Sequence, residues 1–194
     1  MSIALYVVRH GECVHNLQGL VAGQNDSPLT ALGRDQACAN GRLLRELDPE
    51  LSRLAYFSSS LHRACATMEL TREAAGLDPA DYRADRRLME IDCGENTGLP
   101  WPEIEARAQK DPTWHRDRWQ YVHPGGESLA MLEARVAAFL DPLDCNAVIV
   151  THAGPMRMMR KRLLGLSQSA ALEFHPPNAG IMRLSAGSEC WFGE

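Results

Sequence analysis

Residues 147–154 read AVIVTHAG and residues 4–11 read ALYVVRHG, and these two stretches decide the fold. Each is a continuous apolar run, typical of a strand buried on both faces of a parallel sheet. Each run leads directly to a histidine, His152 or His10. Ligands bind beyond the carboxyl ends of such strands, and neighbouring strands lie about 4.8 Å apart. If the two strands are neighbours, we expect the imidazoles to face each other across a gap that fits one phosphate.

Outward from these runs, strands and helices alternate along the chain. Strands are expected at residues 3–8, 54–57, 86–91, 147–150, 181–184 and 190–192. Helices are expected at residues 30–47 and 61–75, after Ser128, and, with Pro155 in the first turn, as far as Gly165. Residues 93–125 are expected to be irregular. This order predicts a three-layer α/β/α fold with a mainly parallel central sheet. We expect a single domain over residues 1–194, with a lid-like excursion at about 95–125.

The composition of the chain disfavours several classes of partner. The net charge of −5 disfavours a nucleic-acid partner, whose footprint would be a basic face. No apolar stretch approaches the roughly 20 residues of a membrane span, and the N-terminus does not resemble a secretory signal. The six cysteines form no C-x-x-C pair. We therefore expect a cytoplasmic protein with reduced thiols and no membrane partner, and the oligomeric state is open.

Cations gather at the same predicted edge of the sheet. The strand at 54–57 leads to Ser58 and then to Arg63 in the first turns of the next helix. A further helix opens at Gly154, and free N–H groups at a helix N-terminus favour an anion. Arg9 precedes His10. Each residue alone has an ordinary structural explanation, but together they indicate a phosphate site. The histidines show no zinc-site spacing, so we expect neither a metal nor another cofactor.

The motifs along the chain, taken in order, resemble those of the histidine phosphatase superfamily, also called the phosphoglycerate mutase-like family. The resemblance covers nearly the whole sequence and rests on Arg9-His10-Gly11-Glu12 with Asn16, Leu29-Thr30-x-x-Gly33-x-x-Gln36-Ala37, Ser58-x-x-x-x-Arg63-Ala64-x-x-Thr67, Leu88-x-Glu90-Ile91-Asp92-x-Gly94, Pro124-Gly125-Gly126-Glu127-Ser128 and Val150-Thr151-His152-Ala153-Gly154.

This resemblance implies roles for individual residues. His10 is the implied nucleophile that becomes phosphohistidine, and Glu90 is the implied proton donor. The phosphoryl oxygens would be held by Arg9, Arg63 and His152, with Asn16 assisting and Gly23 in the loop where the family contacts substrate. Asn178 also fits the family, or simply begins a strand. The chemistry is consistent: attack needs neutral imidazole, nearby cations lower the pKa of histidine, and arginine forks match phosphate oxygens.

Two regions leave the substrate open. The family's acid motif usually continues through an aromatic residue, glutamate and glycine, but here it reads Glu95-Asn96-Thr97-Gly98, and Cys93 replaces a usual aromatic residue. Asp92 is a weaker candidate for the acid. Residues 99–123 are rich in aromatic and basic side chains. They form either a lid, with cations for a second acidic group, or an excursion packed on the core. The residues concerned are Trp101, Trp114, Trp119, Tyr121, Arg107, Arg116 and Arg118.

We therefore expect a phosphomonoesterase acting on a small phosphorylated metabolite. The alternatives are a phosphoglycerate-type mutase and, third, a non-catalytic protein that binds a phosphorylated ligand. Mutases of this family typically carry a C-terminal tail over the pocket. Here the sequence stops at Glu194, directly after the strand expected at 190–192, which favours the phosphatase.

Overall fold

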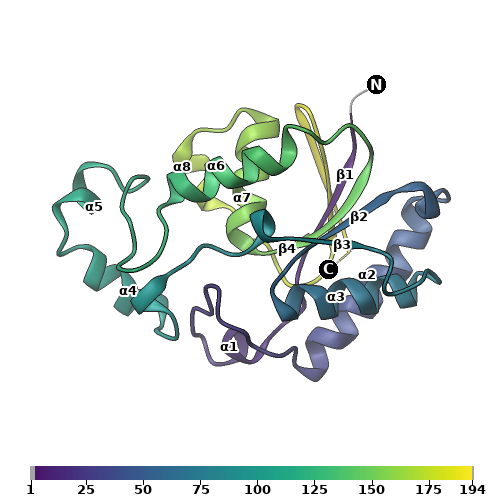
Figure 1. The fold of residues 1–194 in the computed structure, drawn as a ribbon, viewed down its shortest axis with the longest axis horizontal. Helices are drawn as coiled ribbons and strands as arrows, with labels where there is room; N and C mark the ends of the chain where they lie inside the picture. Colours follow the sequence, from purple (N-terminus) through teal and green to yellow (C-terminus); the bar gives the residue numbers. More distant parts are fainter. Residues whose placement is uncertain (1–2, 194) are drawn as a thin grey trace.

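The central sheet has six strands in a computed structural model that describes residues 3–193 (Figure 1). They are β1 (Leu5–Arg9), β2 (Ala55–Ser59), β3 (Arg83–Asp85), β4 (Ala147–Thr151), β5 (Ile181–Ser185) and β6 (Ser188–Phe192). Their order is β3-β2-β4-β1-β5-β6. The first four strands of this order pair in parallel, and β5 and β6 are antiparallel additions. The mainly parallel sheet is confirmed, and β1 and β4 are neighbours.

Helices cover both faces of this sheet. The α-helices are α1 (Val14–Leu17), α2 (Ala31–Leu47), α3 (His62–Ala74), α4 (Trp101–Ala108), α5 (Pro112–Arg116), α6 (Leu129–Leu140), α7 (Ala153–Leu164) and α8 (Gln168–Glu173). Short 3₁₀ turns are η1 (Leu51–Arg53), η2 (Arg86–Leu88) and η3 (Gly94–Asn96). Figure 1 shows α2 and α3 on one side, α6, α7 and α8 on the other, and α4 and α5 projecting away from the sheet. The three-layer arrangement is confirmed.

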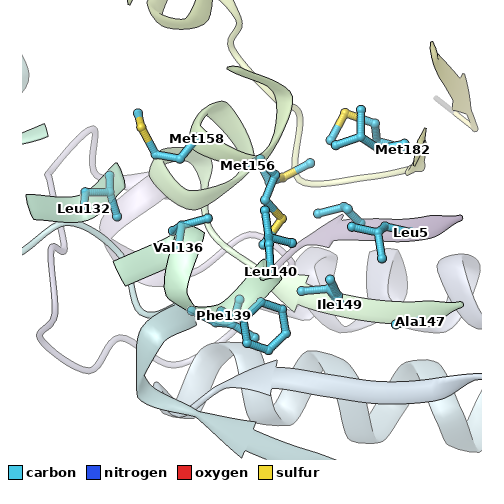
Figure 2. Close-up of a cluster of buried hydrophobic side chains, with 14 of the residues drawn as sticks. Leu5, Leu132, Val136, Phe139, Leu140, Ala147, Ile149, Met156, Met158 and Met182 are labelled. Carbon is cyan, nitrogen blue, oxygen red and sulfur yellow. The ribbon is translucent and has the colours of Figure 1, made fainter. Parts of the chain in front are cut away.

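Two hydrophobic clusters explain the layers. Along β1 and β4, alternate side chains point to opposite faces. Leu5 and Ile149 pack with α6 and α7 in the first cluster (Figure 2), whereas Tyr6 and Val148 belong to the second, with α2 and α3. Phe139 of α6 reaches the sheet in the same view. The continuous apolar runs are therefore buried on both faces, as their sequences predicted.

Two expectations were wrong. The strand expected at 86–91 lies at Arg83–Asp85, because the Asp85 side chain accepts from the backbone and guanidinium of Arg87 and turns the chain into η2. Residues 93–125 are not entirely irregular, since they contain α4 and α5. Each of these helices has a proline in its first turn, a start signal, and Asp111 caps α5.

The loop after β1 is pressed onto the start of α2. A Cβ built at Gly11 would overlap the carbonyl of Gly33, and one built at Gly33 would overlap the carbonyl of Glu12. Gly11 therefore permits a close approach of two backbones. This contact fixes where the chain leaves the sheet.

Among the described residues, no helix combines the length and apolar character that a membrane crossing requires. The single domain over residues 1–194 stays a prediction.

Candidate active site

The carboxyl ends of β1, β4 and β2 place the predicted site residues together. Arg9 is the last residue of β1 and pairs with Thr151 of β4, so His10 and His152 follow at the same level. The backbone N–H of His10 donates to the Thr151 carbonyl at 2.9 Å. The two imidazole centroids are 5.0 Å apart and the rings are tilted by 56°. At this separation the rings are packed against each other, so the expected phosphate-sized gap between them is absent.

His10 is held as a neutral base. Its Nδ1 lies 2.7 Å from the carbonyl oxygen of Gly11, which places the proton on Nδ1 and a lone pair on Nε2. Arg63 Nε donates to that Nε2 at 3.3 Å. Burial, followed by the charges of Arg63 and Arg9, holds the pKa of His10 well below 6.5. The side chain has the form that nucleophilic attack requires.

Arg63 is fixed by backbone rather than by carboxylates. Its Nη1 donates to the carbonyl of Asn25 and its Nη2 to the carbonyl of Gly23, each at 2.7 Å. Burial, the largest cause, lowers the pKa of this guanidinium, and the charge of Glu90 opposes the shift. Gly23 lines the cavity, and its carbonyl oxygen helps to hold Arg63 in position.

Arg9 and His152 keep polar atoms without partners in the described part of the chain. Arg9 Nη1 donates to the Pro176 carbonyl at 2.7 Å, but its buried Nε has no hydrogen bond. His152 is 0% exposed; its Nε2 lies 2.8 Å from Ser59 Oγ and its Nδ1 has no hydrogen bond. Burial, followed by the charge of Arg63, holds the pKa of His152 well below 6.5. Buried polar atoms without partners are rare and point to a polar ligand.

Glu90 lies at the N-terminus of α7. Its Oε1 accepts from the N–H of Gly154 at 3.0 Å and from that of Ile91 at 2.9 Å. A Cβ at Gly154 would overlap Oε1, so only glycine admits the carboxylate there. The helix N-terminus that the sequence assigned to a phosphate is therefore occupied by Glu90. Glu90 lines the cavity and Asp92 does not, since Asp92 instead accepts from the Gly94 N–H.

The Glu90 loop is held by Arg135 of α6. Its guanidinium donates to the carbonyls of Arg87, Met89 and Glu90 at 2.6–2.9 Å. It also pairs with Glu127, which accepts from the backbone of the same loop. The position of Glu90 thus depends on a partly buried ion pair that the sequence motifs alone did not assign.

Two asparagines complete the inner site. Asn16 lines the cavity and its Oδ1 accepts from the Cys13 N–H at 3.2 Å. Asn178 Nδ2 donates to the His10 carbonyl at 2.8 Å and to Asn16 Oδ1 at 3.4 Å. Asn178 therefore supports the backbone of His10 from the bend that precedes β5.

One side of a cavity of about 460 Å³ is lined by Arg9, His10, Asn16, Arg63 and Glu90, and the other side comes from the lid region and α7. His152 and Asn178 are not among the lining residues of this cavity. Trp101, Trp114 and Tyr121 line it, whereas Trp119 is buried in the core and donates to Glu133. Of the two arrangements considered from sequence, the first three aromatic residues fit a lid over the cavity, and Trp119 fits an excursion packed on the core. Asn96 hydrogen-bonds His123 of the cavity wall at 3.2 Å.

Cys93 also lines the cavity, and burial raises the pKa of its thiol to about 12, which keeps it neutral. Sequence reasoning missed Arg157 and His175, which complete the wall. Arg157 lies one helical turn after Ala153, and this periodicity was the available signal. Within residues 3–193, no three His, Cys, Asp or Glu side chains gather in a way that could hold a metal ion.

Comparison with known proteins agrees with this geometry. The family model described as "histidine phosphatase superfamily (branch 1)" matches residues 5–193. The probable phosphoglycerate mutase GpmB of Salmonella choleraesuis (strain SC-B67) is 31% identical over 198 residues, covering 97% of this chain and 87% of the relative. A mycobacterial glucosyl-3-phosphoglycerate phosphatase superimposes with a TM-score of 0.78 at 29% identity, covering 95% of this chain and 91% of that one. A putative α-ribazole-5′-P phosphatase of Escherichia coli K-12 shares the fold, with a TM-score of 0.80 at 22% identity, covering 99% and 95%.

Proposed function

Because this chain belongs to the histidine phosphatase superfamily, we propose that it hydrolyses a small phosphorylated metabolite through a phosphohistidine on His10. One observation carries the proposal. The Nδ1 of His10 is hydrogen-bonded to the Gly11 carbonyl, so the lone pair lies on Nε2, where it accepts a long hydrogen bond from Arg63 Nε that attack on phosphorus would replace. A neutral imidazole with a cation at its reactive nitrogen suits attack on an anionic phosphoryl group.

In the first step, His10 Nε2 forms a bond to phosphorus as the ester P–O bond breaks. The electrons of that bond pass to the leaving oxygen, which takes the proton of the Glu90 carboxyl. Arg9 and Arg63 stabilise the charge on the transferring group, a role that magnesium shares in kinases. The unsatisfied Nδ1 of His152 and Nε of Arg9 are available to the phosphoryl oxygens.

In the second step, the Glu90 carboxylate takes a proton from a water molecule, whose oxygen attacks phosphorus. The N–P bond breaks and its electrons return to Nε2, so that inorganic phosphate leaves and neutral His10 is restored. Glu90 thus acts first as acid and then as base, and no cofactor enters the cycle.

Trapping the intermediate tests the proposal. The protein is mixed with a ³²P-labelled aryl phosphate, quenched without acid and mapped by peptide analysis. We expect an acid-labile, base-stable adduct on His10, absent from His10→Ala. Label on a serine or an aspartate would exclude this mechanism. Activity should also survive exhaustive chelation, and a loss restored by a divalent ion would show that the cations of the pocket are insufficient.

A phosphoglycerate-type mutase is the second candidate, because the 31% identical relative is named a probable phosphoglycerate mutase. Both reactions form the same phosphohistidine, but a mutase must keep water out while an intermediate bisphosphate reorients. The two are separated with 3-phosphoglycerate and catalytic 2,3-bisphosphoglycerate, following 2-phosphoglycerate and free phosphate together. Phosphate release without isomerisation supports the phosphatase, and isomerisation that greatly outruns release would replace it.

A further inference from the structure

Ser59, the last residue of β2, is a buried polar residue that the proposed reaction does not use. Its Oγ accepts from the N–H of Leu61, the N-cap residue of α3, at 3.3 Å, and it lies 2.8 Å from Nε2 of His152. Among residues 3–193, whose positions the structure describes, this Oγ has no third hydrogen-bond partner. Of its two neighbours, only the imidazole nitrogen can accept the hydroxyl proton.

The contact between Ser59 and His152 permits two arrangements of protons. In the first, the hydroxyl donates to Nε2, so the ring proton lies on Nδ1. In the second, Nε2 carries the proton and donates to Oγ. The hydroxyl proton then has no acceptor, and Nδ1 becomes a buried acceptor without a donor. The first arrangement leaves one buried polar group without a partner and the second leaves two, so the contacts favour the first.

The surroundings of this contact strengthen the first arrangement. The N–H of Leu61 lies at the positive end of α3, and a hydroxyl that accepts a hydrogen bond becomes a better donor in turn. Burial, followed by the charge of Arg63, holds the pKa of His152 well below 6.5, so the ring carries one proton and not two. His152 therefore accepts at Nε2 and presents an N–H at Nδ1.

We propose that Ser59 is a positioning residue that fixes the tautomer of His152 and so keeps an N–H donor at Nδ1 for the transferring phosphoryl group. The inference rests on the proposed function, because that function places the phosphoryl group on His10, whose ring centroid lies 5.0 Å from that of His152. The two imidazoles then have complementary forms: His10 offers a lone pair at Nε2, and His152 offers a proton at Nδ1. Because His152 does not line the cavity, this donor acts at the depth of His10 and not on the leaving group.

A purely structural role for Ser59 makes a different prediction. If the hydroxyl served only to hold the N–H of Leu61, its loss would loosen the start of α3, which carries Arg63, and would leave the tautomer of His152 unchanged. Because Arg63 Nε donates to His10 Nε2, a movement of α3 would appear first at His10. The ring nitrogens of the two histidines therefore separate the two roles.

The first arm of the test records long-range ¹H–¹⁵N correlations of the histidine side chains, which distinguish a protonated ring nitrogen from an unprotonated one. His152 is assigned by the loss of its signals in His152→Asn. In the wild type its Nδ1 should be protonated and its Nε2 unprotonated, and in Ser59→Ala the form protonated at Nε2 should appear. Ser59→Thr, which keeps a hydroxyl, and Ser58→Ala, which removes an equally buried hydroxyl from β2, should retain the wild-type pattern. Protonation at Nε2 in the wild type, or an unchanged His152 in Ser59→Ala, would overturn the proposal.

The second arm measures single turnovers of an aryl phosphate. Phosphohistidine formation in Ser59→Ala should slow about 10- to 100-fold, which is less than the loss of an entire donor to the transition state. The apparent Kd of the ester should change little, because His152 lies outside the cavity lining. Ser59→Thr and Ser58→Ala should stay near the wild-type rate, and equal losses in Ser59→Ala and Ser58→Ala would overturn the positioning role. If the wild type hydrolyses no ester, the proposed function fails by itself, and the ¹H–¹⁵N correlations still decide whether Ser59 fixes the tautomer.

Discussion

The inner and outer halves of the cavity are built by different means. His10 is 4% exposed and Arg63 is buried, and both are fixed by backbone carbonyls that belong to the fold. In the outer half, Trp101 is 43% exposed and Arg118 is held by a ring contact. In the inner half, backbone groups hold the reacting side chains in position. In the outer half, the cavity wall is shaped by side chains, which a substitution can exchange. We expect substitutions in the inner half to affect catalysis and those in the outer half to affect selectivity.

Removing the nucleophile should have the largest effect. His10→Ala should lower kcat for an aryl phosphate on the order of 10⁴-fold or more, because no other group supplies the attacking lone pair. The measurement is steady-state phosphate release, with circular dichroism to confirm folding. His62→Ala, which alters an exposed histidine at the start of α3, is the matched control and should change little. Comparable losses in both variants would contradict the assignment.

The loss of activity on removing the acid should depend on the leaving group of the ester. Glu90→Gln keeps an oxygen for the Gly154 N–H but has no acidic proton to transfer to the leaving oxygen. We expect kcat to fall about 10²- to 10⁴-fold for an alkyl phosphate, and much less for an aryl phosphate whose leaving group needs little protonation. Equal losses on both esters, with a larger loss from Asp92→Asn, would move the role to Asp92.

Displacing the carboxylate should reproduce part of that pattern. Gly154→Ala places a methyl group where Glu90 Oε1 lies, so the acid must shift. We expect about a 10²-fold loss on an alkyl phosphate, the scale of a misplacement of about 1 Å, and a smaller loss on an aryl phosphate. Gly187→Ala, outside the cavity lining, is a control for general destabilisation: its φ of 74° makes a side chain there strained, so it should lower stability but leave the ratio of activities on the two esters unchanged. A uniform loss on both esters would mean that the substitution disturbs more than the acid.

Loosening the outer half should have a modest effect. Asn96→Ala removes the hydrogen bond to His123 and should lower the free energy of unfolding by about 1 kcal/mol. KM should rise several-fold for bulky esters while kcat for a small aryl phosphate changes little. Glu103→Gln breaks the half-exposed Glu103–Arg107 pair on α4 and should cost less than about 0.5 kcal/mol. A large fall of kcat in Asn96→Ala would mean that the two halves are not separable.

The smallest effect concerns pH. Protonation of His10 would abolish attack, and its lowered pKa moves that loss to pH values well below 6.5. Under saturating aryl phosphate, kcat should therefore stay nearly constant as the pH falls through 6.5. A decline centred near 6.5 would show that the imidazole titrates as if exposed, which contradicts the burial of the inner half.

The sequence predicted the mainly parallel sheet, and the residues that it placed at strand ends meet at one edge of that sheet, because fully apolar strands and residues at strand ends leave local signals. The catalytic roles of these residues stay predictions. The sequence missed the Arg135 support of Glu90, since a helical arginine has the same local pattern whether it faces a cavity or solvent. It also missed Arg157, for which the one-turn spacing from Ala153 was the only signal. It also placed a strand at 86–91, where the pairing of Asp85 with Arg87 turns the chain instead. The hydrogen bonds that hold the arginines, and the 5.0 Å distance between the centroids of the two imidazoles, depend on tertiary packing and leave no signal in the sequence.

The contact between Gly11 and Gly33 has a consequence for how such a sequence can change over time. A side chain at either position collides with backbone atoms of the other segment, so a second substitution offers no compensation. Exchange at this contact would require the loop after β1 and the start of α2 to move apart together, which would carry His10 away from Arg63. Single-step mutational routes that begin at either glycine should therefore be closed, whereas routes through the lid region stay open to divergence toward new substrates.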